Sequence, residues 1–233
     1  DNGEVEDYRV AISDLDFGDA PDNAALASDF ATLLASDGAR HVMTSGPVLG
    51  EEVDAELDGQ PNGSATGDDT LDASDDEDGV TFLAPLIPGD TINIEVEVSR
   101  AAGLLDAWID LNGDGDWADF GEKVIAAQAV TVGTNALTFN VPFGAKIGAS
   151  TMRFRVSTAG TPLSTGLAAD GEVEDYRVTI RAADFGDAPD SFETRLPPVG
   201  DGARHALVAN PTVFLGATVD ADIDGQADNF ALG

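Results

Sequence analysis

An internal repeat constrains the fold of this chain more than any other feature of its sequence. The string Gly-Glu-Val-Glu-Asp-Tyr-Arg-Val at residues 3–10 returns residue for residue at 171–178, at an offset of 168 (171 − 3). Asp-Phe-Gly-Asp-Ala-Pro-Asp at 16–22 returns at 184–190 with the same offset, and Asp-Gly-Ala-Arg-His at 37–41 returns at 201–205. Repetition at a fixed period is typical of units that stack on their neighbours in a tandem array.

The repeat divides the chain into four parts. We expect residues 1–15 to hold the last strand of a preceding repeat and residues 16–78 to form an acidic, loop-rich segment. Residues 79–183 are expected to form a β-sandwich, and 184–233 the start of the next repeat. Both ends fall inside a repeat, which predicts a parent with many units. The alternative is a two-copy protein with a shortened second copy.

Alternation of polar and apolar side chains predicts strands in the third part. Residues 91–98 alternate for eight positions, and residues 137–141 and 151–156 follow the same pattern, which is typical of strands with one buried face. Further strands are expected at 80–83, 106–111, 123–132 and 172–180. The pattern predicts a mainly β fold, an antiparallel β-sandwich repeat, with Asp/Gly/Pro-rich, loop-dominated segments between successive sandwiches. One short helix is expected around residues 29–35.

The charge balance indicates which partners the chain can have. With 44 acidic and 11 basic residues the formal net charge is −33, which argues against nucleic acid or an anionic membrane surface as a partner. Cations are the natural complement, and a solvated, salt-tolerant surface explains part of the acidity. The absence of cysteine excludes disulfides and thiolate metal sites. No apolar run approaches the roughly 20 residues that span a bilayer.

One stretch has the spacing of a calcium loop. Oxygen-bearing side chains alternate at Asp110, Asn112, Asp114 and Asp116, a spacing that turns several oxygens toward one hard cation. The twelfth position is Gly121, where an EF-hand has a bidentate Glu, so Asp119 or Glu122 must complete the ligand set. The flanks lack a helical period, and we expect the loop to join two strands. The alternative is an Asx-rich turn without a metal.

Three further acidic clusters are candidate calcium sites. One cluster precedes the first strand of the sandwich. Another has acids at alternate positions of a loop, and the last lies at the start of the final strand. They comprise Asp75, Asp76, Glu77 and Asp78; Asp54, Glu56 and Asp58; and Glu172, Glu174 and Asp175. The alternatives are a strand edge kept charged against aggregation for the second cluster and a salt bridge to an arginine of the sheet for the third. Strand alternation places Glu174 on the face of Tyr176, so Glu174 needs a buried partner or a bulge.

The connector between units carries acids as well. Asp16, Asp19 and Asp22 flank Gly18 and Pro21 in a segment unsuited to regular helix or central strand. Calcium bound here would stiffen the joint between units.

Several of these strings together resemble a known family. Gly-Glu-Val-Glu-Asp-Tyr, Asp-Phe-Gly-Asp-Ala-Pro-Asp and Asp-Glu-Asp-Gly-Val at 76–80 are similar to the GEVED domain family. The resemblance covers nearly the whole chain. It implies a tandem module of a large secreted or surface-attached bacterial protein, and hence an extracellular location.

We therefore expect a calcium-stabilised structural repeat of an extracellular bacterial filament, stalk or adhesin. Its partners would be neighbouring copies of the repeat, joined head to tail. The alternative is a calcium-dependent module that binds a glycan or cell-surface receptor, in which Trp117 of the calcium loop would contact the ligand. We expect no enzyme activity, because nothing in the sequence singles out a catalytic acid.

Overall fold

The computed structural model describes residues 6, 13–22, 30–67, 76–196, 201–208, 212–213 and 215–231. Most of the preceding repeat's expected last strand, and Asp75, lie outside these residues. The described chain is mainly β with antiparallel sheets. It contains no helix long and apolar enough to cross a membrane.

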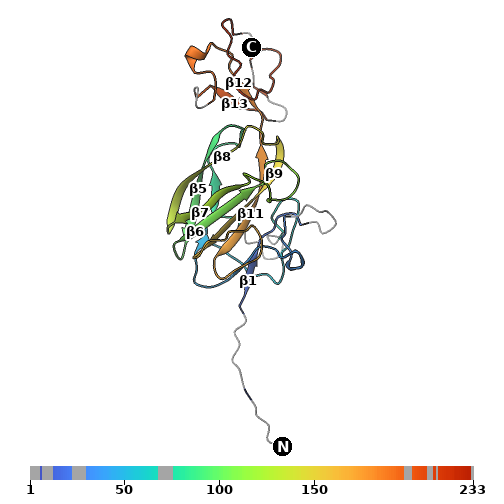
Figure 1. Ribbon diagram of the computed structural model, residues 1–233, viewed down its shortest axis with the longest axis vertical. Helices are drawn as coiled ribbons and strands as arrows, with labels where there is room; N and C mark the ends of the chain where they lie inside the picture. The colour runs from blue at the N-terminus through green and yellow to red at the C-terminus, as the bar shows by residue number, and fades with distance from the viewer. Residues whose placement is uncertain are drawn as a thin grey trace, which may run out of the picture.

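Two antiparallel sheets form the larger part of the molecule (Figure 1). The first has the order β11 (Glu172–Ile180), β9 (Gly148–Ser157), β6 (Gly103–Ile109) and β7 (Lys123–Val130). In the second, β5 (Thr91–Ser99) pairs with β8 (Gly133–Asn140) and also with β4 (Val80–Phe82) and β3 (Val48–Leu49). We call these two sheets together the two-sheet body.

A single apolar cluster joins the two sheets. Ile92, Ile94 and Val96 of β5 alternate with exposed polar residues and are fully buried. They belong to the same cluster as Phe154 of β9 and Leu49 of β3. Because Leu49 comes from the acidic segment, that segment contributes directly to the core.

All seven strands expected in the third part are present, with shifts of a few residues at their ends. The helix expected around residues 29–35 does not form in the described residues. In the described part of 29–35 only a 3₁₀ turn, η1 (Leu34–Ser36), forms. The carbonyls of Phe30 and Ala31 accept hydrogen bonds from Arg153, and the amides of Thr32 and Leu33 donate to Asp22. A helix over residues 29–35 would pair the carbonyls of Phe30 and Ala31 and the amide of Leu33 within itself, and these contacts occupy all three.

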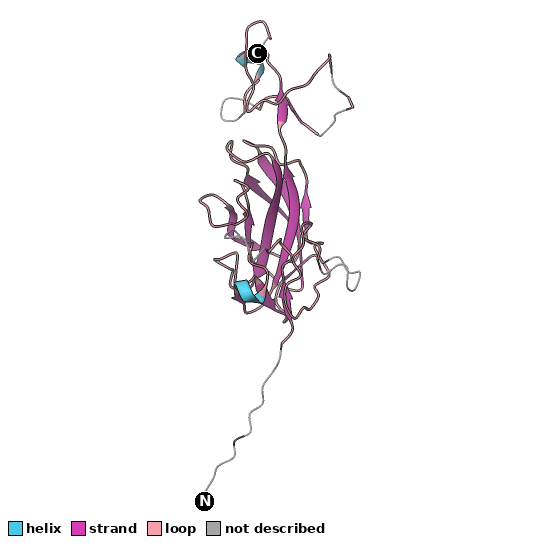
Figure 2. Cartoon of the chain, turned by 90° about the vertical axis from the view of Figure 1, so that its right-hand side faces the viewer, coloured by secondary structure: helices cyan, strands magenta, loops and turns pink. Residues whose placement is uncertain are grey.

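Two small connectors have the same local pairing. The first connector, residues 13–67 without β3, contains β1 (Leu15–Phe17) and β2 (Arg40–Val42); a parallel pair adds β10 (Leu167–Ala168). The second connector, residues 183–231, contains β12 (Ala183–Phe185), η2 (Asp190–Phe192) and β13 (Arg204–Ala206). Asp16 lies opposite His41 in the first connector, and Asp184 lies opposite His205 in the second. The connectors lie at opposite ends of the two-sheet body (Figures 1 and 2).

Candidate metal centre

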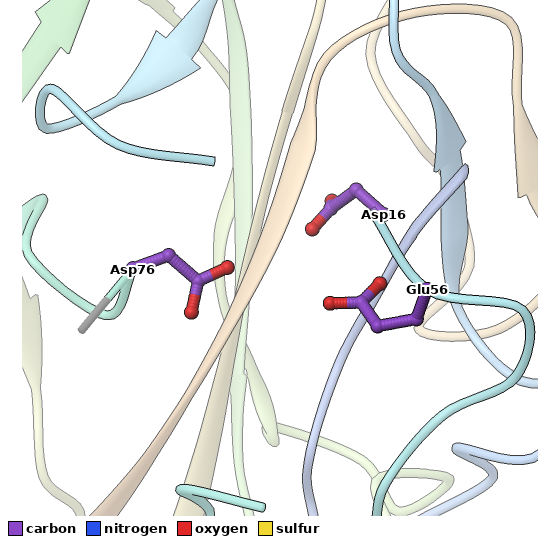
Figure 3. Close-up of side chains that lie close together, drawn as sticks. All are labelled: Asp16, Glu56 and Asp76. Atoms are coloured by element: carbon purple, nitrogen blue, oxygen red, sulfur yellow. The ribbon is translucent and has the colours of Figure 1, made fainter. Parts of the chain in front are cut away.

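Acids from distant parts of the chain meet where the first connector contacts the two-sheet body. The carboxylate oxygens of Asp16, Glu56 and Asp76 lie within 4.8 Å of one another, and the three side chains point toward a common space (Figure 3). The charges of further acids act on this group, and we call the whole set the acidic site. It comprises Asp16, Asp54, Glu56, Asp76, Glu172 and Glu174.

Backbone pairing positions the acids of the connector. Asp16 lies in the middle of β1, and its Oδ2 accepts a hydrogen bond of 2.8 Å from the amide of Val173 in β11. Glu56 forms an isolated bridge with Leu15, and its Oε2 accepts a bond of 2.8 Å from the amide of Phe17. The connector thus holds two carboxylates against the start of β11.

The start of β11 supplies the facing acids. Glu172 accepts a hydrogen bond from the amide of Leu49. Glu174 accepts one from the amide of Gly79 at 2.8 Å and another from the hydroxyl of Tyr176 at 3.0 Å. The pairing of β11 with β9 continues without a register shift, so no bulge releases Glu174. Its burial is instead supported by these two donors.

Four carboxylate oxygens of the acidic site are buried without a hydrogen-bond partner among the described residues. They are Asp16 Oδ1, Asp54 Oδ1, Glu56 Oε1 and Glu172 Oε1. Asp16 and Glu172 have no exposed surface. A buried acceptor without a donor costs about 1–3 kcal/mol, a cost that either a proton shared between two carboxyls, as between Asp54 and Glu56, or a bound cation would offset.

Burial and mutual repulsion disfavour the charged forms of these acids. Desolvation raises the pKa of Asp16, Glu172 and Glu174 well above their ordinary values, and the charges of neighbouring acids raise them further. Burial also raises the pKa of Glu56 to about 12, with contributions from Asp54 and Asp16. The acidic site can hold its charges near neutral pH only if a cation shares the space.

The donor set fits calcium. All six side chains offer hard oxygen atoms and none offers nitrogen or sulfur, which favours calcium or magnesium over transition metals. Calcium accepts six to eight oxygens in flexible geometry, whereas magnesium demands a near-ideal octahedron and usually retains waters. Crowded carboxylates held by backbone amides therefore match calcium better.

The loop between β6 and β7 contains a second group of acids. Carboxylate oxygens of Asp110, Asp114 and Glu122 lie within 4.8 Å of one another. Asp110 and Glu122 are buried, and burial raises the pKa of both. Of the two acids that could complete the ligand set, Glu122 is therefore the one that the fold brings to Asp110. The sequence prediction of a loop between strands is confirmed by its place between β6 and β7.

The same loop also contains Asx-type turns. The amides of Gly113 and Gly115 donate to Asp110, and the Asn112 amide group donates to Asp114 and Asp119. Asp114, Asp116 and Asp119 form a neighbouring and more exposed group of carboxylates within 4.8 Å. The loop thus has both the carboxylate spacing of a metal site and the side-chain hydrogen bonds of an Asx-rich turn.

Trp117 anchors this loop to the rest of the molecule. Its indole Nε1 donates to the carbonyl of Thr151 at 3.1 Å, and its ring lies 4.5 Å from that of Phe30 in the first connector. The guanidinium of Arg153 lies 4.7 Å from the ring centroid. Trp117 is buried, so its surface is not offered to a ligand. The exposed aromatic residue of the loop is Phe120.

Three predicted ligands make other contacts. Asp175 forms a buried salt bridge of 2.6 Å with Arg153, the alternative that the sequence left open. Asp58 accepts hydrogen bonds from the amides of Leu34 and Gly59. Asp78 accepts from the amide of Glu51, while its charge also raises the pKa of Glu174.

The connector acids also separate by role. Asp16 joins the acidic site, whereas Asp19 accepts from the amide of Gly67 at 2.5 Å. Asp22 accepts from the Ser36 hydroxyl and from two backbone amides, which lower its pKa against the opposing effect of burial. The sequence grouped these three acids, and Asp16 is the one that the structure brings to Glu56, Asp76 and the Val173 amide.

Two buried arginines were missed by the sequence analysis. Arg153 donates to Asp175, to the Thr32 hydroxyl and to three backbone carbonyls. Arg155 donates to His41 at 3.0 Å and to carbonyls of residues 163, 165 and 166. Their alternation with apolar residues in β9 resembles an ordinary half-exposed strand. The connector, however, covers the polar face, so both arginines are buried.

Comparison with known proteins gives one match. The model of the GEVED domain matches residues 104–179, which include the loop at Asp110 and the two glutamates of β11. Neither a curated protein nor a solved structure matches the chain.

Proposed function

We propose that this chain, whose residues 104–179 match the GEVED domain model, is a calcium-stabilised structural module of that family. In this proposal the two-sheet body is a β-sandwich, and the sandwich and its connector form the repeating unit of an extracellular bacterial filament, stalk or adhesin. Neighbouring units are the partners, and the role is not enzymatic.

The observation that carries the proposal is the acidic site. Four buried carboxylate oxygens without hydrogen-bond partners among the described residues lie where the connector meets the sandwich, and Asp16 and Glu174 are 158 positions apart in the sequence (174 − 16). A cation bound there would join the connector to the sandwich, a task for which this chain has no disulfide. Because the unfolded chain lacks the site, binding would add directly to folding stability.

The surroundings in which the module works follow from the same chemistry. Extracellular modules bind calcium with dissociation constants of about 10⁻⁴–10⁻³ M, so calcium of millimolar order would fill them outside the cell. At the far lower calcium level of the cytosol the sites would be empty, and the chain would remain loosely folded before secretion.

The glycan- or receptor-binding alternative depended on an exposed aromatic residue beside the ions. Trp117 does not meet this requirement, because it is buried against Phe30 and its indole nitrogen bonds to the Thr151 carbonyl. Phe120 of the same loop is exposed, so the alternative now depends on Phe120 and not on Trp117.

The proposal is tested by calcium titration and thermal unfolding of the full chain. We expect isothermal titration to detect bound calcium, and the melting temperature to fall when a chelator replaces millimolar calcium. Magnesium at the same concentration serves as the control and should have a smaller effect. If no calcium binds and the melting temperature does not change in chelator, the proposal is refuted.

A further inference from the structure

The two connectors of this chain are copies of one segment that are docked on different surfaces. In each copy a threonine hydroxyl donates to an alanine carbonyl: Thr32 to Ala20 at 2.9 Å, and Thr194 to Ala188 at 2.6 Å. Added to the identical strand register of β1–β2 and β12–β13, these bonds establish which residues correspond. The two copies can therefore be compared position by position.

The first connector is docked on the two-sheet body that follows it in the sequence. Phe30 is 7% exposed because it packs on Trp117, and His41 is buried beside Arg155. The corresponding residues of the second connector, Phe192 and His205, are exposed, Phe192 by 73%. We call this surface of a connector its forward face.

The second connector is docked on the two-sheet body that precedes it. Leu196 is 2% exposed and belongs to an apolar cluster with Ile87 and Phe185. Arg204 binds Asp90 through two nitrogens, at 2.8 Å and 3.1 Å. We call the surface formed by Leu196 and Arg204 the rear face.

The rear face of the first connector has no such contact among the described residues. Leu34, which corresponds to Leu196, is 51% exposed. The amides of these two leucines donate to equivalent aspartates, Leu34 to Asp58 and Leu196 to Asp224, so the two side chains start from the same local structure. Their difference in burial comes from the presence or absence of a two-sheet body behind them.

The paired arginines show the same relation. Arg40 Nη1 donates to Asp37 and to the Gly38 carbonyl, and Arg204 Nη1 donates to the equivalent Asp201 and Gly202. The guanidinium is thus oriented alike in both copies. In the first connector no carboxylate in the described residues takes the place that Asp90 has beside Arg204.

We propose that each connector is a two-faced adaptor that binds one copy of the two-sheet body on its forward face and another on its rear face. The occupant of the first connector's rear face, which is exposed at Leu34, is the tip of a second two-sheet body, with Ile87 against Leu34 and Asp90 beside Arg40. At a joint between units, one connector would make both sets of contacts: those of the first connector on its forward face and those of the second connector on its rear face. This inference rests on the proposed tandem role and names the surfaces that carry it.

A two-unit chain tests the inference. Residues 1–170 joined to residues 3–233 preserve the natural sequence at the junction, because residues 3–10 and 171–178 are identical. Since the chain has no cysteine, Ile87→Cys in the first unit and Leu34→Cys in the second give one defined pair. We expect this pair to form an intramolecular disulfide under mild oxidation, read by mass spectrometry of the digested chain.

The present chain supplies both controls. Ile87→Cys with Leu196→Cys should cross-link to the same extent as the pair across the new joint, because it probes the docked second connector. Ile87→Cys with Leu34→Cys in the present chain should not cross-link, because the first connector lies at the opposite end of the two-sheet body. Leu34 is half exposed, so its substitution leaves the fold intact.

The outcomes separate this inference from the proposed function. Cross-linking of the control pair without cross-linking across the new joint would refute the adaptor, as would failure of the control pair itself. Neither pair includes an acid, so the cross-links report on the joint whether or not calcium stabilises the chain. Loss of the calcium effect alone would overturn the proposed function and leave the joint in place.

Discussion

Asp16→Asn should separate metal binding from ordinary packing at the acidic site. Asparagine has nearly the same shape, and its Oδ1 can still accept the hydrogen bond from Val173 that Asp16 Oδ2 accepts at 2.8 Å. The substitution removes one negative charge from a group of six acids. Its matched control is Asp184→Asn, the same position of the second connector, where no two-sheet body supplies the facing glutamates among the described residues.

The expected magnitude follows from linkage. In an assay with calcium at about 100 times the dissociation constant, which is about 10–100 mM for the extracellular class of site, a filled site stabilises the fold by about 2.7 kcal/mol. Weakening calcium binding about 100-fold removes roughly 2 kcal/mol of this. For a chain of this size, calcium should therefore raise the melting temperature of the variant by about 4–8 °C less than it raises that of the parent. Asp184→Asn should leave the calcium-dependent shift unchanged.

The sign should reverse when calcium is removed. In chelator, the substituted amide side chain no longer adds a buried charge, and its NH₂ group can donate to a neighbouring carboxylate oxygen that lacks a partner among the described residues. We expect the variant to be as stable as the parent or more stable by up to about 1 kcal/mol. Differential scanning calorimetry with calcium and with chelator measures both effects. A loss of stability in chelator equal to that in calcium would refute the metal interpretation of Asp16.

Three further predictions concern the buried contacts around the first connector. Trp117→Ala should cost about 3–5 kcal/mol in denaturant unfolding, whereas Phe120→Ala, in the same loop but fully exposed, should change stability by less than about 0.5 kcal/mol. Arg153→Lys should cost roughly 3 kcal/mol, because an ammonium group cannot replace the planar guanidinium that binds both oxygens of one carboxylate and three carbonyls. Burial and the Arg155 cation lower the pKa of His41, so the ring stays neutral in the folded chain. The unfolded chain takes up a proton at this ring below a pH of about 6.5. The free energy of unfolding should therefore fall by about 1.4 kcal/mol for each pH unit below that value. In saturating calcium, His41→Gln should flatten this dependence and His205→Gln should not.

Each of these predictions has a defined failure. Equal losses for the two aromatic substitutions would mean that Trp117 does not anchor the loop. A lysine at position 153 that leaves stability unchanged would show that the arginine bonds are replaceable by water. An unchanged pH profile after His41→Gln would mean that another group titrates in this range.

The strands could be predicted from the sequence because their signal is local. A period of two places every second side chain on one face, whatever lies elsewhere in the chain. The range predicted for β11, residues 172–180, agrees with the structure at both ends, and the alternating residues of β5 are buried as expected. The conflict at Glu174 was also visible, since an acid on the face of Tyr176 requires a partner.

Both connectors were likewise visible in the sequence as copies of one segment. Their strings recur in order, and the structure gives them the same register and the same internal hydrogen bonds. Repetition of sequence therefore predicted repetition of local structure.

Only the tertiary structure decided which acids share a site. The sequence placed Glu56, Asp76 and Glu174 in three separate clusters, and packing of the connector on β11 brings them together with Asp16. The same packing directs Asp175 to Arg153 and Asp58 to backbone amides. Local spacing shows which side chains have ligand chemistry, but their convergence depends on contacts between segments more than 100 residues apart, which spacing alone does not encode.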